Sequence, residues 1–162
     1  MPEGLRDGHP TYWRVMGHGD RPALAIHCGL AHSGAWSGVM SHLEARISAT
    51  AFDLPGHGRS GDWDGQGDYP RLCARVAASF IDRPLDLIGH SFGAVTALRL
   101  ALAAPEAVRT LTLIEPVLFA AVRGTPVWDA YRSEIAPFER AMAEGRRDAA
   151  AAIFTTLWGT GA

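Results

Sequence analysis

The chain has 162 residues and a mass of 17.3 kDa, which is enough for a domain that buries roughly two-thirds of its unfolded surface. Apolar residues make up 48% of the chain and charged residues 20%, as in ordinary globular proteins, and the net charge is −2. Binding to nucleic acid or to an anionic membrane needs clustered basic residues, so this charge balance argues against both. The two cysteines, Cys28 and Cys73, are too few for a disulfide scaffold.

We expect neither a targeting signal nor a membrane span in this sequence. Residues 1–7 are mostly polar, unlike a secretory signal, and the longest apolar stretch, residues 94–104, contains Arg99 and is too short to span a bilayer. We therefore expect a cytoplasmic protein, and an enzyme is the favoured class.

Strand-like and helix-like segments alternate through the first two-thirds of the chain. The patterns predict strands at residues 11–16, 23–26, 47–52, 85–88 and 109–114, and helices at 36–46, 69–81 and 92–104. Alternation of this kind is typical of βαβ units, so we expect the α/β class, with a mostly parallel central sheet and flanking helices.

The pattern changes after Glu115-Pro116. Thr125-Pro126 is a helix start, and an apolar helical face follows it and is expected to break at Pro137. A second helix is predicted at residues 148–157, and no strand follows. We therefore divide the chain into a core, residues 1–116, and a helical segment, residues 117–162.

The motif with the clearest chemistry is Gly89-His90-Ser91-Phe92-Gly93. It has the form G-x-S-x-G, with a predicted strand directly before it and a predicted helix directly after it. A serine on such a sharp turn projects at the edge of the sheet, and its crowded backbone requires glycine two residues before and after it. The serine also lies at a helix N-terminus, which favours a developing negative charge.

Two further segments extend this motif into a family pattern. His27-Cys28-Gly29-Leu30 follows the second predicted strand, and Asp53-Leu-Pro-Gly-His-Gly-Arg-Ser60 follows the third. With these three segments the chain resembles the N-terminal two-thirds of an α/β-hydrolase, of the serine-nucleophile group that carries a helical cap after the sixth strand. The resemblance implies the α/β-hydrolase fold, here truncated within the cap, with residues 117–162 as a partial cap.

The resemblance also implies roles for particular residues. Ser91 would be the nucleophile, and the backbone N–H groups of Phe92 and Gly29 would form the oxyanion hole, with Leu30 as the alternative if the loop is shifted by one residue. Cys28 stands where the family usually has glycine, and we interpret it as a packing residue. The pocket would include Leu30, His32, Phe119 and Trp128, although the aromatic residues could equally form the core of the cap itself.

The family's base and acid are harder to place. In the family the histidine follows the eighth strand and the acid usually follows the seventh, and none of the seven histidines here occupies a base position. Glu115 ends the strand after the nucleophile helix and is a candidate acid, or merely a loop residue that leads into the cap. Because the strand at 110–114 would be an exposed apolar edge, we expect this chain to be part of a longer protein. The alternative is that a partner supplies the missing half of the fold.

The predicted function is that of a serine hydrolase that acts on a small ester or another acyl compound, with little turnover by these 162 residues alone. The alternative is a non-catalytic protein of the same fold that binds a small ligand. The sequence has no metal-ligand spacing and no dinucleotide or phosphate-loop motif, so no cofactor is expected. The substrate and the oligomeric state are left open.

Overall fold

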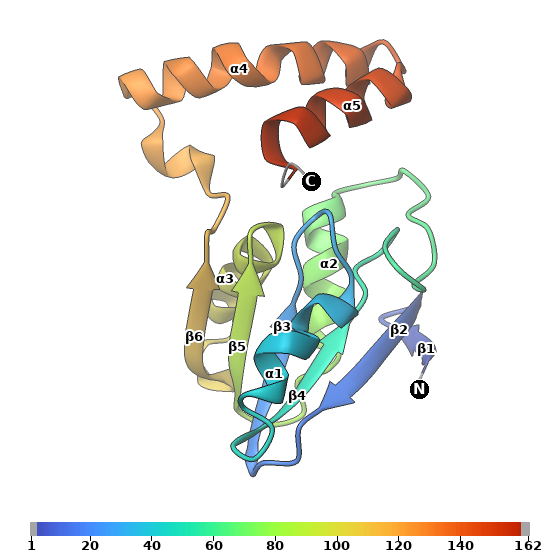
Figure 1. The fold of residues 1–162 in the computed structure, drawn as a ribbon, viewed down its shortest axis with the longest axis vertical. Helices are drawn as coiled ribbons and strands as arrows, with labels where there is room; N and C mark the ends of the chain where they lie inside the picture. Colours follow the sequence, from blue (N-terminus) through green and yellow to red (C-terminus); the bar gives the residue numbers. More distant parts are fainter. Residues whose placement is uncertain (1–2, 160–162) are drawn as a thin grey trace. The chain divides into compact units, whose positions relative to one another are not determined.

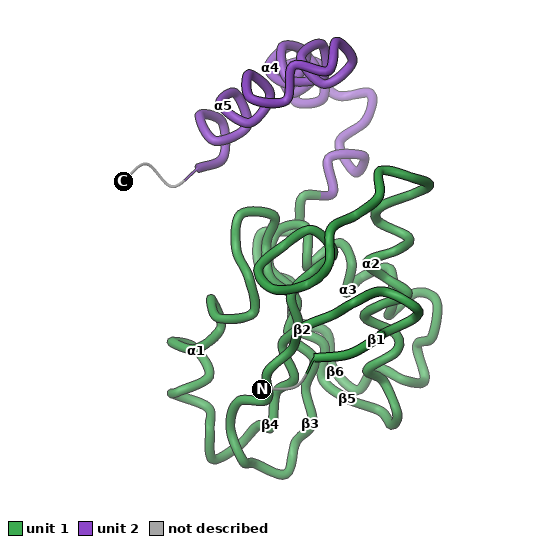
Figure 2. Tube along the Cα trace, turned by 90° about the vertical axis from the view of Figure 1, so that its right-hand side faces the viewer, with its two compact units in different colours: residues 1–117 green, residues 118–162 purple. Residues whose placement is uncertain are grey.

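The computed structural model describes residues 3–159. They form two compact units, which divide between Val117 and Leu118 (Figure 2). The first unit is built on one six-stranded sheet, in the order β1-β2-β4-β3-β5-β6 (Figure 1). Its strands are β1 (Glu3–Arg6), β2 (His9–Met16), β3 (Arg21–Ile26), β4 (Ile47–Phe52), β5 (Leu85–His90) and β6 (Val108–Ile114). The four strands β4, β3, β5 and β6 run parallel, whereas β1 and β2 are antiparallel additions at one edge. The expected fold class is therefore confirmed.

Helices cover both faces of this sheet because the side chains of the buried strands alternate between them. Leu24 and Ile26 of β3 pack toward α2 (Tyr69–Ala78) and α3 (Phe92–Ala103). Ala23 and Ala25, on the opposite face, pack toward Trp36 and Met40 of the short helices η1 (Ser33–Trp36) and α1 (Ser37–Ser41). A further 3-10 turn, η2 (Pro105–Ala107), leads from α3 into β6. The side chains of β3 residues 23–26 are all buried, so β3 lies at the centre of a three-layered unit.

The first helix is shorter than the sequence pattern predicts. A helix was expected over residues 36–46, but α1 ends at Ser41, and the backbone then turns through hydrogen bonds from His42 to Val39 and from Leu43 to Met40. The Ser41 hydroxyl donates to the Gly38 carbonyl, the kind of local bond by which serine competes with helical geometry.

The first strand, β1, was not predicted from the sequence. The turn Asp7-Gly8 has positive φ at both residues, 48° and 77°, as a two-residue hairpin with a primed turn requires. The Asp-Gly dipeptide was the signal for this hairpin, which adds β1 to the edge of β2.

The second unit consists of η3 (Phe119–Val122), α4 (Pro126–Ala143) and α5 (Arg147–Trp158). The Thr125 hydroxyl caps α4 by accepting from the Trp128 N–H, as expected. The expected break at Pro137 is wrong, since α4 continues through it. Pro137 and Ser133, whose carbonyl loses its helical partner, are both exposed residues, so the missing hydrogen bond lies where solvation costs least. Within residues 3–159, no helix is long and apolar enough to cross a membrane.

Candidate active site

Ser91 lies on the sharp turn between β5 and α3. Its backbone has φ 54° and ψ −115°, a combination that L-residues rarely adopt and that costs about 1–3 kcal/mol. The surroundings hold this conformation: the Ser91 N–H donates to the Ile114 carbonyl of β6 at 2.8 Å, and the Ser91 carbonyl accepts the first bonds of α3. Ser91 therefore has the strained strand-to-helix geometry that the sequence motif requires.

The two glycines of the motif are required by close backbone approaches. A Cβ atom on Gly93 would lie 2.5 Å from the His27 carbonyl oxygen and even closer to that of Ile26. A Cβ atom on Gly89 would lie 2.5 Å from the Cα atom of Ala94. Neither approach is compatible with any side chain. Glycine at position 93 therefore lets α3 pack against the end of β3, and glycine at position 89 lets it pack against the end of β5.

Two sets of backbone amides near this turn are free to donate. Phe92 is the first residue of α3, so its N–H has no acceptor within the helix. Gly29 and Leu30 occupy the centre of a turn closed by the bond from the Ala31 N–H to the Cys28 carbonyl, at 3.2 Å. Among the residues that the structure describes, neither the Gly29 nor the Leu30 N–H has a protein acceptor. These are the amides that the family resemblance assigns to an oxyanion hole.

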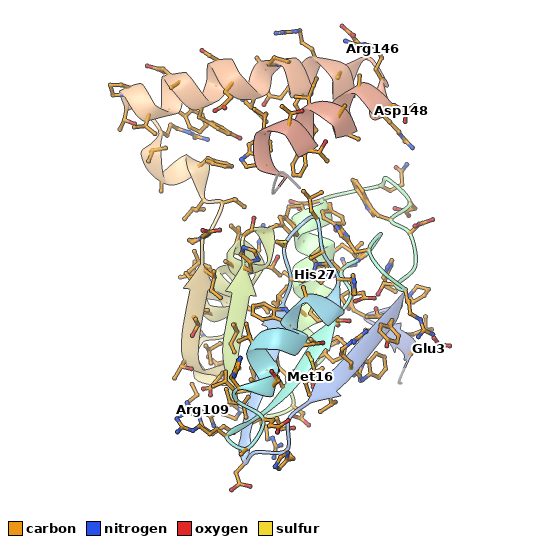
Figure 3. All side chains as sticks on the ribbon, in the orientation of Figure 1. Glu3, Met16, His27, Arg109, Arg146 and Asp148 are labelled. Carbon is orange, nitrogen blue, oxygen red and sulfur yellow. The ribbon has the colours of Figure 1, made fainter. Side chains whose placement is uncertain are left out.

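His27 anchors the loop that carries these amides. It lies directly after β3 (Figure 3). Its side chain is buried, with 1% of the residue exposed. Its Nε2 accepts from the Leu54 N–H at 2.9 Å, so the ring proton is on Nδ1, which donates to the Cys28 carbonyl at 2.7 Å. Burial lowers the pKa of His27 to about 4. Both ring nitrogens are engaged in structural bonds, so His27 has no free nitrogen for proton transfer.

Asp53 organises the second loop, residues 53–60. Its carboxylate is buried and accepts from the Ser33 N–H at 2.6 Å and from the Arg59 N–H at 2.8 Å, while the Ser60 hydroxyl donates to its carbonyl. Burial alone would oppose ionisation, but the hydrogen bonds from the Ser33 side chain and from the Arg59 and Ser33 backbone outweigh it and lower the pKa of Asp53. Gly58 packs against the carboxylate, where a side chain would collide. Gly58 and Ser60 of this loop motif therefore both contact Asp53, which holds the loop together.

The candidate acid lies beside a histidine. Glu115 follows β6 with a positive φ of 48°, and its carboxylate oxygen is 3.5 Å from Nε2 of His90. The Glu115 side chain is 85% exposed. Within residues 3–159, the Ser91 hydroxyl makes no hydrogen bond to any histidine. The pairing of Glu115 with His90 was not expected from the sequence, because only the parallel contact of β5 with β6 brings the two together.

The residues expected in a pocket lie in both units. In the first unit, Leu30 is 52% exposed and the His32 ring accepts from the Gly34 N–H at 3.1 Å, which caps η1. In the second unit, Phe119 and Trp128 pack on Tyr131, and their ring centroids lie 4.2 and 5.6 Å, respectively, from that of Tyr131. Phe119 and Trp128 are thus part of an aromatic cluster within their own unit, and a pocket role for them stays a prediction. Among the described residues, no group of three or more His, Cys, Asp or Glu side chains could hold a metal ion.

Comparison with known proteins places this geometry in a family. The model of the alpha/beta hydrolase family matches residues 23–160. Pimeloyl-acyl-carrier protein methyl ester esterases of Methylococcus capsulatus and Nitrosomonas europaea are each 39% identical, over 103 and 97 residues, which are 62% and 59% of this chain. The chain spans only 38% of the length of each of these relatives.

Solved structures of similar proteins share this fold. The thioesterase domain from the curacin biosynthetic pathway is 30% identical with a TM-score of 0.65, over 71% of this chain and 45% of that one. DbjA is 22% identical with a TM-score of 0.69, over 87% of this chain and 54% of that one, and shows the fold alone. Because the family model covers well over half of the residues, the resemblance is confirmed, and the chain belongs to the alpha/beta hydrolase family.

Proposed function

We propose that this protein is a serine esterase in which Ser91 attacks the carbonyl carbon of an ester and becomes acylated. The observation that carries the proposal is the backbone of Ser91, which is held at φ 54° at the N-terminus of α3 beside free amides. Such strain persists only where the surrounding structure imposes it, and it is concentrated at functional sites. A serine with an ordinary structural role would have no need of it.

In the proposed reaction, the base takes the proton of the Ser91 hydroxyl as the Ser91 oxygen attacks and a tetrahedral intermediate forms. The protonated base then gives this proton to the leaving alcohol. Water then attacks the acyl-enzyme and releases the carboxylic acid and the free serine. The N–H groups of Phe92 and Gly29, or of Leu30 in the shifted alternative, would donate to the negatively charged oxygen. Each such donor is worth about 2.7–4 kcal/mol of transition-state stabilisation.

Glu115 is proposed as a candidate for the acid that orients the catalytic base. Its place at the end of β6, next to the elbow, supports this role, whereas its exposure and its contact with His90 favour the simpler role of a loop residue. The base itself is not assigned to any histidine of this chain, since none occupies the position of the base in the family. In addition, His27 and His57 have both ring nitrogens against backbone atoms, and the His32 ring caps η1. For the same reason we expect these 162 residues alone to turn over little substrate.

The substrate class is proposed from the relatives. Two of them are named as methyl ester esterases, and both match the chain at 39% identity. We therefore propose an ester of a small alcohol with an acyl chain as the substrate. Ser91 is also the residue type that esterases and thioesterases share, so a thioester is the second substrate to test.

The test uses the protein at its natural length, with Ser91→Ala and a matched control, Ser133→Ala, which removes an exposed hydroxyl on α4. A fluorophosphonate probe is expected to label the wild type once, at Ser91, and to leave Ser91→Ala unlabelled. Hydrolysis of a p-nitrophenyl ester and of a methyl ester should follow the same pattern, with Ser133→Ala equal to the wild type. Ester hydrolysis that survives in Ser91→Ala would contradict the proposal.

The same experiment separates the alternative raised by the sequence, a non-catalytic protein that binds a small ligand. That alternative predicts no labelling of the wild type, no ester hydrolysis, and ligand binding that Ser91→Ala leaves unchanged.

A further inference from the structure

His57 joins the two loops of the candidate site. Its Nε2 lies 2.9 Å from the Gly29 carbonyl oxygen, 28 residues away in sequence, and its Nδ1 lies 3.0 Å from the carbonyl oxygen of Pro55. Both neighbours accept hydrogen bonds, but a neutral imidazole has only one N–H to donate. The ring can therefore satisfy only one of the two carbonyls.

The Tyr69 hydroxyl determines which of the two carbonyls needs His57 as its hydrogen-bond donor. Its hydroxyl donates to the Pro55 carbonyl at 2.8 Å and also lies 3.4 Å from Nδ1 of His57. Pro55 thus has a donor without the imidazole, whereas within residues 3–159 the Gly29 carbonyl has no donor other than His57. This arrangement favours a ring proton on Nε2, facing Gly29, with the unprotonated Nδ1 against the Pro55 carbonyl oxygen and the tyrosine hydroxyl.

Tyr69 is itself held in place. Its ring lies between Trp63, at a centroid distance of 5.1 Å, and Phe92, on which it stacks at 5.6 Å. Burial raises the pKa of Tyr69, so its hydroxyl stays a donor at every working pH. The two residues that carry the proposed oxyanion donors, Phe92 and Gly29, are thus linked through Tyr69 and His57.

We propose that His57 and Tyr69 are a positioning pair for the oxyanion loop: the Nε2–H of His57 holds the Gly29 carbonyl, and the Tyr69 hydroxyl keeps the imidazole in the tautomer that does so. The inference rests on the proposed esterase function. Gly29 has open space around its Cα atom and no side chain to restrict its rotation, so it needs an outside contact to fix its orientation. Since a peptide unit is planar, fixing the Gly29 carbonyl also fixes the direction of the Leu30 N–H, which is the donor of the shifted alternative.

The positioning has a specific energetic benefit. Oxyanion donors stabilise a transition state only if they point at the developing charge before the reaction begins. A donor that must be ordered during the reaction loses part of its effect, so a freed loop lowers the rate of the chemical step more than it lowers ground-state binding.

The first measurement does not depend on activity. In the wild type at a pH where His57 is neutral, the ring ¹⁵N spectrum should show the Nε2–H tautomer, and Tyr69→Phe should move the proton toward Nδ1, because Pro55 then lacks a donor. In His57→Phe, the backbone order parameters of Gly29 and Leu30 should fall from about 0.85 to below about 0.6. An Nδ1–H tautomer in the wild type, or unchanged order parameters in His57→Phe, overturns the proposal.

The second measurement is kinetic, on the protein at its natural length. His57→Phe should lower kcat by about 10- to 100-fold with KM within about twofold, less than the loss of a whole oxyanion donor. His57→Gln, which retains an N–H donor of similar reach, should recover most of kcat. The kcat of Tyr69→Phe should lie between those of His57→Phe and His57→Gln. His42→Phe, an exposed histidine after α1, is the matched control and should equal the wild type.

The outcomes separate this inference from the function on which it rests. A kcat for His57→Phe within twofold of the wild type overturns the positioning pair while the esterase stands. Ester hydrolysis that persists in Ser91→Ala contradicts the esterase, and the ¹⁵N spectra then still decide whether His57 holds Gly29.

Discussion

The buried imidazole of His27 makes the stability of this protein dependent on pH in a predictable window. Folding keeps this ring neutral, because its Nε2 accepts from the Leu54 N–H and protonation would put a charge into a site that is 1% exposed. Its pKa is lowered from 6.5 to about 4. The unfolded chain therefore binds more protons than the folded chain between these two values, and stability falls as the pH falls through that range.

The size of the effect follows from the shift. One pKa unit corresponds to 1.36 kcal/mol, so this one histidine costs about 2 kcal/mol of unfolding free energy at pH 5 and about 3 kcal/mol at pH 4, relative to pH 8. Such a loss is a large part of the stability of an ordinary domain.

The assay is urea unfolding at a series of pH values between 8 and 4, with His27→Gln and, as the control, the exposed His42→Gln. The glutamine at position 27 can still accept from Leu54 but cannot be protonated, so its stability curve should be flatter than that of the wild type by about 2 kcal/mol between pH 8 and pH 5. His42→Gln should follow the wild type. Parallel curves for His27→Gln and the wild type would refute the reasoning.

Two further predictions concern packing and charge. Gly93→Ala should destabilise the first unit by about 1–3 kcal/mol in urea unfolding, because its Cβ would collide with the His27 carbonyl, whereas Gly38→Ala, which has open space, should be neutral or slightly stabilising. Equal effects of the two substitutions would contradict the close packing. Asp86→Asn should cost about 2 kcal/mol at pH 7, since hydrogen bonds from Arg109, Thr110 and Arg21 lower the pKa of this carboxylate to about 2. That difference should narrow as the pH falls below about 4, and a difference independent of pH would refute the assignment.

The order of the elements was predictable because it depends on local patterns. Apolar runs of four to six residues with intervening amphipathic segments identified all four parallel strands and the helices α2 and α3. Local contacts that the apolar pattern does not reveal explain two of the errors, whereas the third, the expected break at Pro137, arose because α4 continues through the proline. Ser41 ends α1 early, and the Asp7-Gly8 turn adds a strand outside the βαβ alternation.

The candidate site was predictable only where one short motif specifies both the residue and its backbone. The turn at Ser91 is such a case, since the strand before it and one glycine on each side of it are close to it in sequence. The role of His57 could not be inferred in this way, because its partner Gly29 is 28 residues away and meets it only after β3 and β4 pair. The contact of Glu115 with His90 likewise depends on the register of β5 with β6.

From the sequence we could infer the alternation of strands and helices, the strained turn at Ser91 and the family, because each depends on residues that are neighbours along the chain. The folded structure was needed for the protonation site of His27, the engagement of Asp53 by two separate loops, and the link from Tyr69 through His57 to Gly29. The physical reason is that a hydrogen bond depends on distance and direction between two groups. For groups in different loops, both are set by how the strands beneath those loops pair.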